Sequence, residues 1–209
     1  SVTVEAGKNI TLNLNGQTID LQAKKILVYG KLTIQDLTTE GEGKITSSGN
    51  SGAIEIQTNG SATLQNGTIE GTKGAAVTLK YNTDQNNSFS MEGGTVTGTK
   101  NTIDAMGGVV EITGGSITTS STSIGDYAIR NGYGYTNITI GIKNGNNSHV
   151  YVTSILGKAD SILTINSGIV GRIGGVINEN DILNGLFEQD ITSLLPAGKM
   201  CEEVTANEQ

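Results

Sequence analysis

Large rings, prolines, cysteines and histidines are scarce in this chain. Its 209 residues include no tryptophan, one proline, one cysteine and one histidine, and aromatic residues account for only 4%. A disulfide within the chain needs two cysteines, and a histidine-based zinc site needs more than one histidine. Because Cys201 and His149 are each the single residue of their type, we expect neither an internal disulfide nor such a zinc site. Few large side chains are available to fill a wide core, which favours a thin and regular one. We expect no metal and no cofactor.

Basic residues are also few. The 13 lysines and arginines are outnumbered by 20 aspartates and glutamates, which gives a formal net charge of −7. A protein that binds nucleic acid needs a concentrated positive surface, so we expect no nucleic-acid partner. An anionic membrane surface is disfavoured for the same reason. The chain contains no continuous apolar run long enough to span a bilayer, so we expect no membrane insertion.

Glycine, threonine, asparagine and aliphatic residues are abundant instead, a composition typical of short strands joined by turns. One phrase returns along the chain: "TLQNGTIEG" at 63–71, "SMEGGTVTG" at 90–98 and "EITGGSIT" at 111–118. An alignment on its apolar residue extends the repeat to seven segments, spaced by about 25 residues. The aligned anchors are Leu14, Ile34, Leu64, Met91, Ile112, Ile140 and Ile165.

The residues around each anchor predict strands. The residue two places before it is also apolar and the residue between is polar, so the two apolar side chains share one face of a strand. Five places after the anchor, Ile19, Ile69, Val96 and Ile117 turn inward again behind a glycine-containing corner. A unit of this size cannot bury its own apolar face, but stacked units bury a continuous core. We therefore predict an all-β solenoid of about seven rungs, a rung being one turn of the coil.

This rung pattern resembles the right-handed parallel β-helix of the pectin-lyase-like type. The resemblance covers roughly residues 8–175. The repeat pattern breaks from Asp181 onward, so we predict a β-helix over 1–180 and a C-terminal cap, or the start of a next module, at 181–209. The repeated phrase with its threonine-rich flanks is similar to repeat regions of surface-exposed bacterial proteins, and the segment "DITSLLPAGKMCEEV" at 190–204 is similar to a module that follows such repeats. The resemblance implies an extracellular, cell-surface location.

Enzymes of this fold cut polysaccharides with carboxylates placed on neighbouring rungs. The column directly after the anchors contains one acid, Glu92, and the next column also contains one, Asp36. A third column brings Glu40 and Glu70 together if the register holds; they form either a solvated face or a weak cation site. No column sets two acids beside a base, so we predict no catalytic residue.

Tyrosines concentrate in one short segment, "DYAIRNGYGYTN". Exposed tyrosine rings stack on sugars, and charged side chains beside them orient hydroxyl groups. The alternative is a loop that packs on its own rung. The candidate ligand-binding residues are Asp126, Tyr127, Arg130, Tyr133 and Tyr135.

We expect a non-catalytic extracellular β-helix segment of a bacterial surface protein, acting in adhesion, in contact with glycans or other surface ligands, or as a stiff display rod. The alternative is a polysaccharide lyase or glycoside hydrolase whose site has no recognisable motif.

Overall fold

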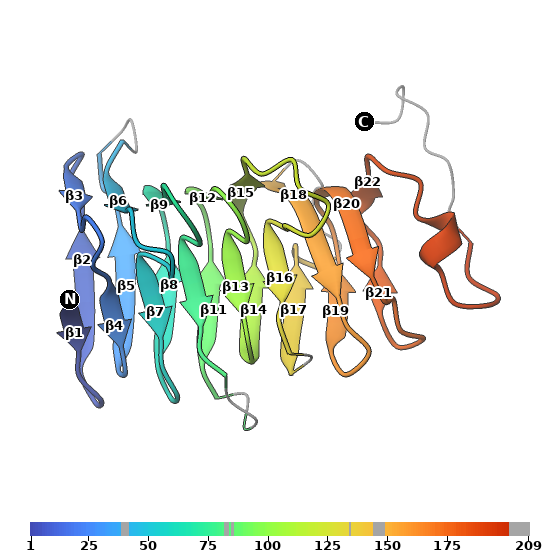
Figure 1. Cartoon of the computed structure of the whole chain (residues 1–209), viewed down its shortest axis with the longest axis horizontal. Coiled ribbons are helices and arrows are strands. Elements are labelled where there is room, and N and C mark those ends of the chain that lie inside the picture. The colour runs from blue at the N-terminus through green and yellow to red at the C-terminus, as the bar shows by residue number, and fades with distance from the viewer. Residues whose placement is uncertain (39–41, 82–83, 85, 134, 144–148, 201–209) are drawn as a thin grey trace.

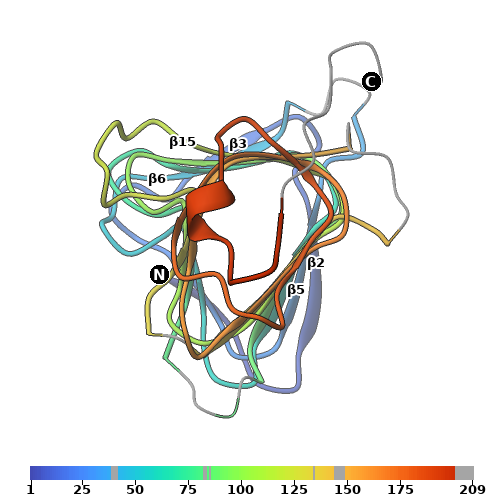
Figure 2. The ribbon, with the colours of Figure 1, turned by 90° about the vertical axis from the view of Figure 1, so that its right-hand side faces the viewer.

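The chain folds into a parallel β-solenoid of about six turns, close to the seven rungs predicted. The computed structural model describes residues 1–38, 42–81, 84, 86–133, 135–143 and 149–200 (Figure 1). In the view along the coil from its C-terminal end, the chain winds anticlockwise toward the viewer, so the coil is right-handed (Figure 2). Every strand pair is parallel, and the strands form three stacks that we call A, B and C.

Stack A is the eight-stranded sheet. Its strands are β2 (Asn9–Asn13), β5 (Lys31–Gln35), β8 (Ser61–Leu64), β11 (Ser88–Met91), β14 (Gly108–Ile112), β17 (Thr136–Ile140), β19 (Ile162–Ile165) and β21 (Ile182–Leu183). Stacks B and C belong to the second sheet, and they are joined where β18 (Val150–Gly157) pairs with a strand of each.

Stack B begins with β3 (Thr18–Asp20), β6 (Lys44–Ser47), β9 (Thr68–Gly71), β12 (Thr95–Gly98) and β15 (Gly115–Thr119). Stack C begins with β1 (Val2–Val4), β4 (Ile26–Val28), β7 (Ile54–Ile56), β10 (Val77–Leu79), β13 (Ile103–Ala105) and β16 (Ile129–Asn131). After β18, the strand β20 (Ile169–Gly175) and then β22 (Leu186–Phe187) continue the sheet.

Six of the seven predicted anchors form one buried column in stack A. Strand pairing connects Ile34, Leu64, Met91, Ile112, Ile140 and Ile165 in that order, and all six are fully buried. The prediction for Leu14 was wrong, because Leu12 is the partner of Ile34. Leu14 is buried at the corner after the strand, where its N–H bonds to the carbonyl of Gln35.

The inward column of stack B is confirmed for Ile19, Ile69, Val96 and Ile117. In the second rung Ile45 takes this place, because the turn before β6 is longer than in the neighbouring rungs. Thr46 therefore stands between Asp20 and Glu70 on the outer face. The predicted stacking of Glu40 on Glu70 involves Glu40, which lies outside the described residues, and the described partner of Glu70 in the second rung is Thr46.

The two ends of the coil differ. The strands continue past residue 180 to β21 and β22, and the 3₁₀ helix η2 (Thr192–Leu194) then crosses the end of the coil (Figure 2). Ile191 is buried there, and Leu194 and Leu195 pack against the core. At the other end Val2 and Ile10 are exposed on the first rung. Among the described residues, no helix has the length and apolar character needed to cross a membrane.

Candidate functional site

Two of the predicted site residues, Asp126 and Tyr127, belong to a packed loop. The Asp126 carboxylate accepts a hydrogen bond of 2.6 Å from the Ser121 hydroxyl. Arg172 donates to the Asp126 carbonyl at 2.9 Å and lies 4.5 Å above the centre of the Tyr127 ring. Tyr127 is only 8% exposed. This half of the segment packs on its own rungs, and Tyr127 does not offer a ring to a ligand.

Tyr133 and Tyr135 are exposed, and they meet a third tyrosine that sequence reasoning missed. The ring centre of Tyr81 lies 5.6 Å from that of Tyr133 and 6.1 Å from that of Tyr135. Both pairs are edge-to-face, with interplanar angles of 77° and 75°. The exposed fractions are 51% for Tyr81, 61% for Tyr133 and 39% for Tyr135. Together with Lys80 and Met106 they line a hollow of about 460 Å³, which we call the tyrosine hollow.

The tyrosine hollow arises from unequal turn lengths at the corner between stacks C and A. Tyr81 follows β10 by two residues and Tyr133 follows β16 by two residues, while the rung between them belongs to β13 and β14. In that middle rung only Met106 and Gly107 separate the two strands. The Tyr81 and Tyr133 rings come from turns two rungs apart, about 9.6 Å along the coil, and they meet edge to face beside Met106.

Tyr135 belongs to the same turn as Tyr133 but lies at its far end, next to stack A. Tyr135 directly precedes β17, and its carbonyl accepts a hydrogen bond of 3.0 Å from the N–H of Gly108, the first residue of β14. This bond fixes the Tyr135 backbone to the floor rung. The tyrosine hollow therefore has a floor of Met106 and walls supplied by the turns of the rungs on either side.

Arg130 lies beside the tyrosine hollow and is held by a partner that was not predicted. Its Nε and Nη2 donate to the two carboxylate oxygens of Asp104 at 2.9 and 2.7 Å. The hydrogen bonds from Arg130 to Asp104 raise the pKa of the guanidinium above its ordinary value. Asp104 and Arg130 are neighbours in the register of stack C. The expectation that Asp126 works together with Arg130 gives way to this Asp104–Arg130 pair.

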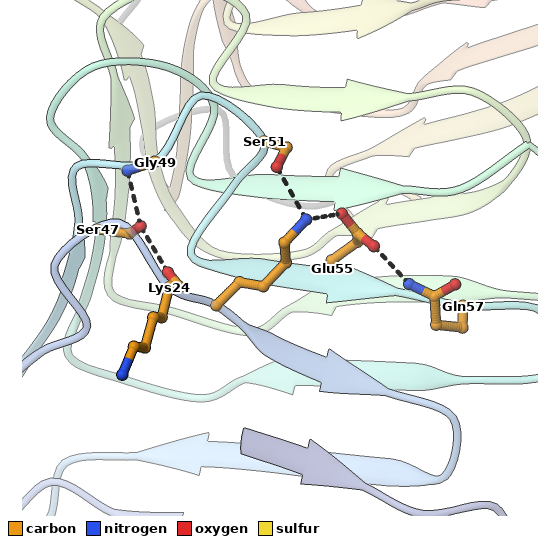
Figure 3. Close-up of polar contacts among 7 residues, drawn as sticks. Lys24, Ser47, Gly49, Ser51, Glu55 and Gln57 are labelled. Carbon is orange, nitrogen blue, oxygen red and sulfur yellow. Dashed lines mark hydrogen bonds and ion pairs between the residues drawn. The ribbon is translucent and has the colours of Figure 1, made fainter. Parts of the chain in front are cut away.

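A second polar cluster occupies the same outer face nearer the N-terminus (Figure 3). Glu55 is buried, and its two carboxylate oxygens accept hydrogen bonds from the ammonium of Lys25 and from the Gln57 amide. The Lys25 ammonium also donates to the Ser51 hydroxyl at 2.9 Å. Glu55 is thus a carboxylate with both oxygens engaged inside the protein, and this arrangement ties neighbouring rungs together.

Other described carboxylates are also engaged by groups of the protein. Glu70 pairs with Lys44 at 3.2 Å. Asp36 is buried, and burial works to raise its pKa. Hydrogen bonds from the backbone of Gly43, Thr38 and Gly16 outweigh this effect and hold the pKa below its ordinary value. Within the described ranges, no three histidine, cysteine, aspartate or glutamate side chains gather closely enough to hold a metal ion.

No protein-family model, no curated protein and no solved structure matches this chain. The geometry of the molecule itself therefore has to support any assignment of function. Among the features described above, the tyrosine hollow is the one that gathers exposed apolar rings and polar groups in one place.

Proposed function

We propose that this chain is a non-catalytic β-helix segment of a bacterial surface protein that contacts glycans through the tyrosine hollow. The observation that carries the proposal is the convergence of Tyr81, Tyr133 and Tyr135, three exposed rings from two turns, on one hollow. The similarity of the repeated phrase to repeat regions of bacterial surface proteins supports the surface location.

The chemistry of the rings suits sugars. The C–H faces of a pyranose are apolar and pack on an aromatic face, while the tyrosine hydroxyls are placed to bond with sugar hydroxyls. The perpendicular rings present faces in two directions, so a sugar stacked on one ring meets the edge of another. Although the turns that carry Tyr81 and Tyr133 are two rungs apart, their ring centres are 5.6 Å apart, so the rings form one continuous surface on which a sugar can stack.

A rigid coil is also a suitable support. On one side of the hollow the backbone is held by the pairing of β14 with β17 and by the bond between Gly108 and Tyr135, and on the other side the Lys80 N–H bonds to the Ile56 carbonyl. A backbone held in this way loses less conformational freedom when a ligand binds. Each ring is expected to contribute about 0.5–1.5 kcal/mol. A single hollow then binds weakly, and useful adhesion comes from many copies presented together.

The proposal is tested by screening the chain, displayed in many copies on beads, against an array of plant, host and bacterial glycans. Tyr133→Ala should weaken the binding of a retained glycan about 2- to 10-fold, and Tyr81→Ala should do the same. Tyr29→Ala is the matched control, because Tyr29 is exposed but does not line the hollow.

Two results contradict the proposal. Binding that survives the loss of both Tyr81 and Tyr133 places the contact elsewhere on the coil. Cleavage of any glycan during the screen, measured as new reducing ends or unsaturated products, favours the alternative of a polysaccharide-active enzyme.

A further inference from the structure

We infer that the tyrosine hollow selects glycans whose sugars carry an anionic group, and that Lys80 is the residue that makes this selection. The inference rests on the proposed function and adds the charge class of the ligand. The net charge of −7 disfavours anionic partners for the chain as a whole, so a positive charge at the hollow is notable.

Lys80 is the charged side chain in the lining of the hollow. The other lining residues are three tyrosines and a methionine, which carry no charge at neutral pH. Lys25, Lys44 and Arg130 each have a carboxylate partner, at Glu55, Glu70 and Asp104. Within the described part of the chain, the Lys80 ammonium forms no ion pair.

Lys80 lines the hollow, and its backbone is anchored there. Its N–H donates to the carbonyl of Ile56 at 2.9 Å, and its carbonyl accepts a hydrogen bond of 2.9 Å from the buried Asn87 amide. Both bonds connect Lys80 to structural groups on either side of the corner. The ammonium is therefore presented from a fixed point and remains available to a ligand.

The Arg130 guanidinium is not available for bidentate binding of an anion. Arg130 already engages both oxygens of Asp104, so its two-pronged face is occupied by a carboxylate of the protein. A lysine ammonium is a compact point charge, and it pairs with a carboxylate or with a tetrahedral sulfate ester without requiring a flat partner. The shared chemistry is thus a singly charged oxyanion on a sugar whose ring stacks on tyrosine.

The test compares three probes that share a galactose-based backbone: a neutral galactan oligosaccharide, an oligogalacturonate and a sulfated galactan oligosaccharide. Binding to the whole chain is measured by titration calorimetry at about 50 and 300 mM salt. We expect at least one anionic probe to bind about 5-fold more tightly than the neutral one at low salt, the range of a solvent-exposed ion pair. We expect high salt to reduce this difference.

Two lysine variants identify the responsible residue. Lys80→Gln should abolish the preference for the anionic probe, and Lys80→Glu should reverse it. Lys73→Gln removes the same charge from an exposed lysine outside the hollow and should leave the preference intact. Melting curves of all three variants should match that of the parent chain.

The outcomes distinguish the role of Lys80 from the proposed glycan contact through the tyrosines. Equal binding of neutral and anionic probes, or a preference that persists in Lys80→Gln, overturns the role of Lys80 and leaves the proposed glycan contact standing. Binding of anionic probes that survives the loss of the tyrosines but not of Lys80 contradicts the proposed stacking. Failure of all three probes to bind overturns this inference; if the wider glycan array is also negative, the proposed function fails with it.

Discussion

The outer face of stack C presents two contrasting regions along a single column. Toward the N-terminus, Glu55 is buried and shares its oxygens between Lys25 and Gln57. Three rungs further on, Arg130 pairs with Asp104 beside exposed tyrosines and an ammonium without an ion-pair partner among the described residues. The fold is the same in both regions, and only the side chains and turn lengths differ.

This contrast separates polar groups that stabilise the coil from polar groups that are available to a ligand. A carboxylate whose oxygens are both satisfied inside the protein has little capacity left for chemistry, however conspicuous it is in the sequence. An exposed ring or an unpaired ammonium contributes little to folding and retains its capacity for a partner. The contrast predicts opposite effects of mutation on stability and on binding in the two regions.

The largest effect is expected from adding a carboxylate one position after Glu55, where the side chain faces the core. Ile56 is fully buried and faces the core directly after Glu55. Ile56→Asp places an acid among aliphatic side chains with no partner, and the free energy of unfolding should fall by about 4 kcal/mol or more. Urea denaturation followed by circular dichroism measures this. An unchanged midpoint would show that Ile56 does not face the core.

A smaller effect is expected when Glu55 itself is removed. Glu55→Ala removes the carboxylate partner of the partly buried Lys25 ammonium, which keeps only its bond to Ser51, and removes the acceptor of the Gln57 amide. The free energy of unfolding should fall by about 1–3 kcal/mol. Glu92→Ala is the matched control, since Glu92 is an exposed glutamate with a single amide partner, Gln65, and should change stability by about 0.5 kcal/mol or less.

The Asp104–Arg130 pair should show an intermediate coupling. Its two side chains are 19% and 35% exposed, and the contact is bidentate. A double-mutant cycle with Asp104→Ala and Arg130→Ala should give a coupling energy of about 1 kcal/mol. A coupling near zero, measured by denaturation of the two single variants and the double variant, would remove this pair from the framework of the hollow.

The smallest effect on stability is expected at the tyrosines. Tyr133→Ala removes a ring that is mostly in solvent, so the free energy of unfolding should change by about 0.5 kcal/mol or less. Urea denaturation measures this change. The same substitution should weaken glycan binding, so stability and binding respond in opposite ways to Glu55→Ala and Tyr133→Ala. Strong destabilisation by Tyr133→Ala would identify the ring as structural.

The sequence predicted the repeating core well, because apolar alternation every second residue is imposed by burial in each rung. It misplaced Leu14, since Ile10, Leu12 and Leu14 alternate regularly and a shift of two residues keeps the same face buried. It missed Thr46 as the partner of Glu70, because a longer turn before β6 shifts the register of the second rung.

The candidate site was predicted only in part. Tyr133 and Tyr135 stood out as neighbours in the sequence, but Tyr81 comes from a distant segment. Tyr81 is close to Tyr133 because β10 and β16 are two rungs apart and the rung between them has a turn of only two residues, between β13 and β14. The signal was present in the register, since Tyr81 and Tyr133 each follow their strand by two residues. Partners such as Asp104 for Arg130 likewise require the strand pairing to be known first.

The long strand β18 has a consequence for the order in which the coil opens. Its first half pairs with β15 and its second half with β16, and β20 follows it along nearly the whole length. In earlier rungs a turn separates stacks B and C, so each short strand can exchange its amide protons by a local opening of its own. In β18, Val152 pairs with Ile117 of stack B, Ile155 pairs with Ile129 of stack C, and both residues also pair with β20 and are buried. The Val152 and Ile155 amides should therefore be among the slowest to exchange with solvent in the described coil, while the amides of β1 and β2, where Val2 and Ile10 are exposed, should exchange faster.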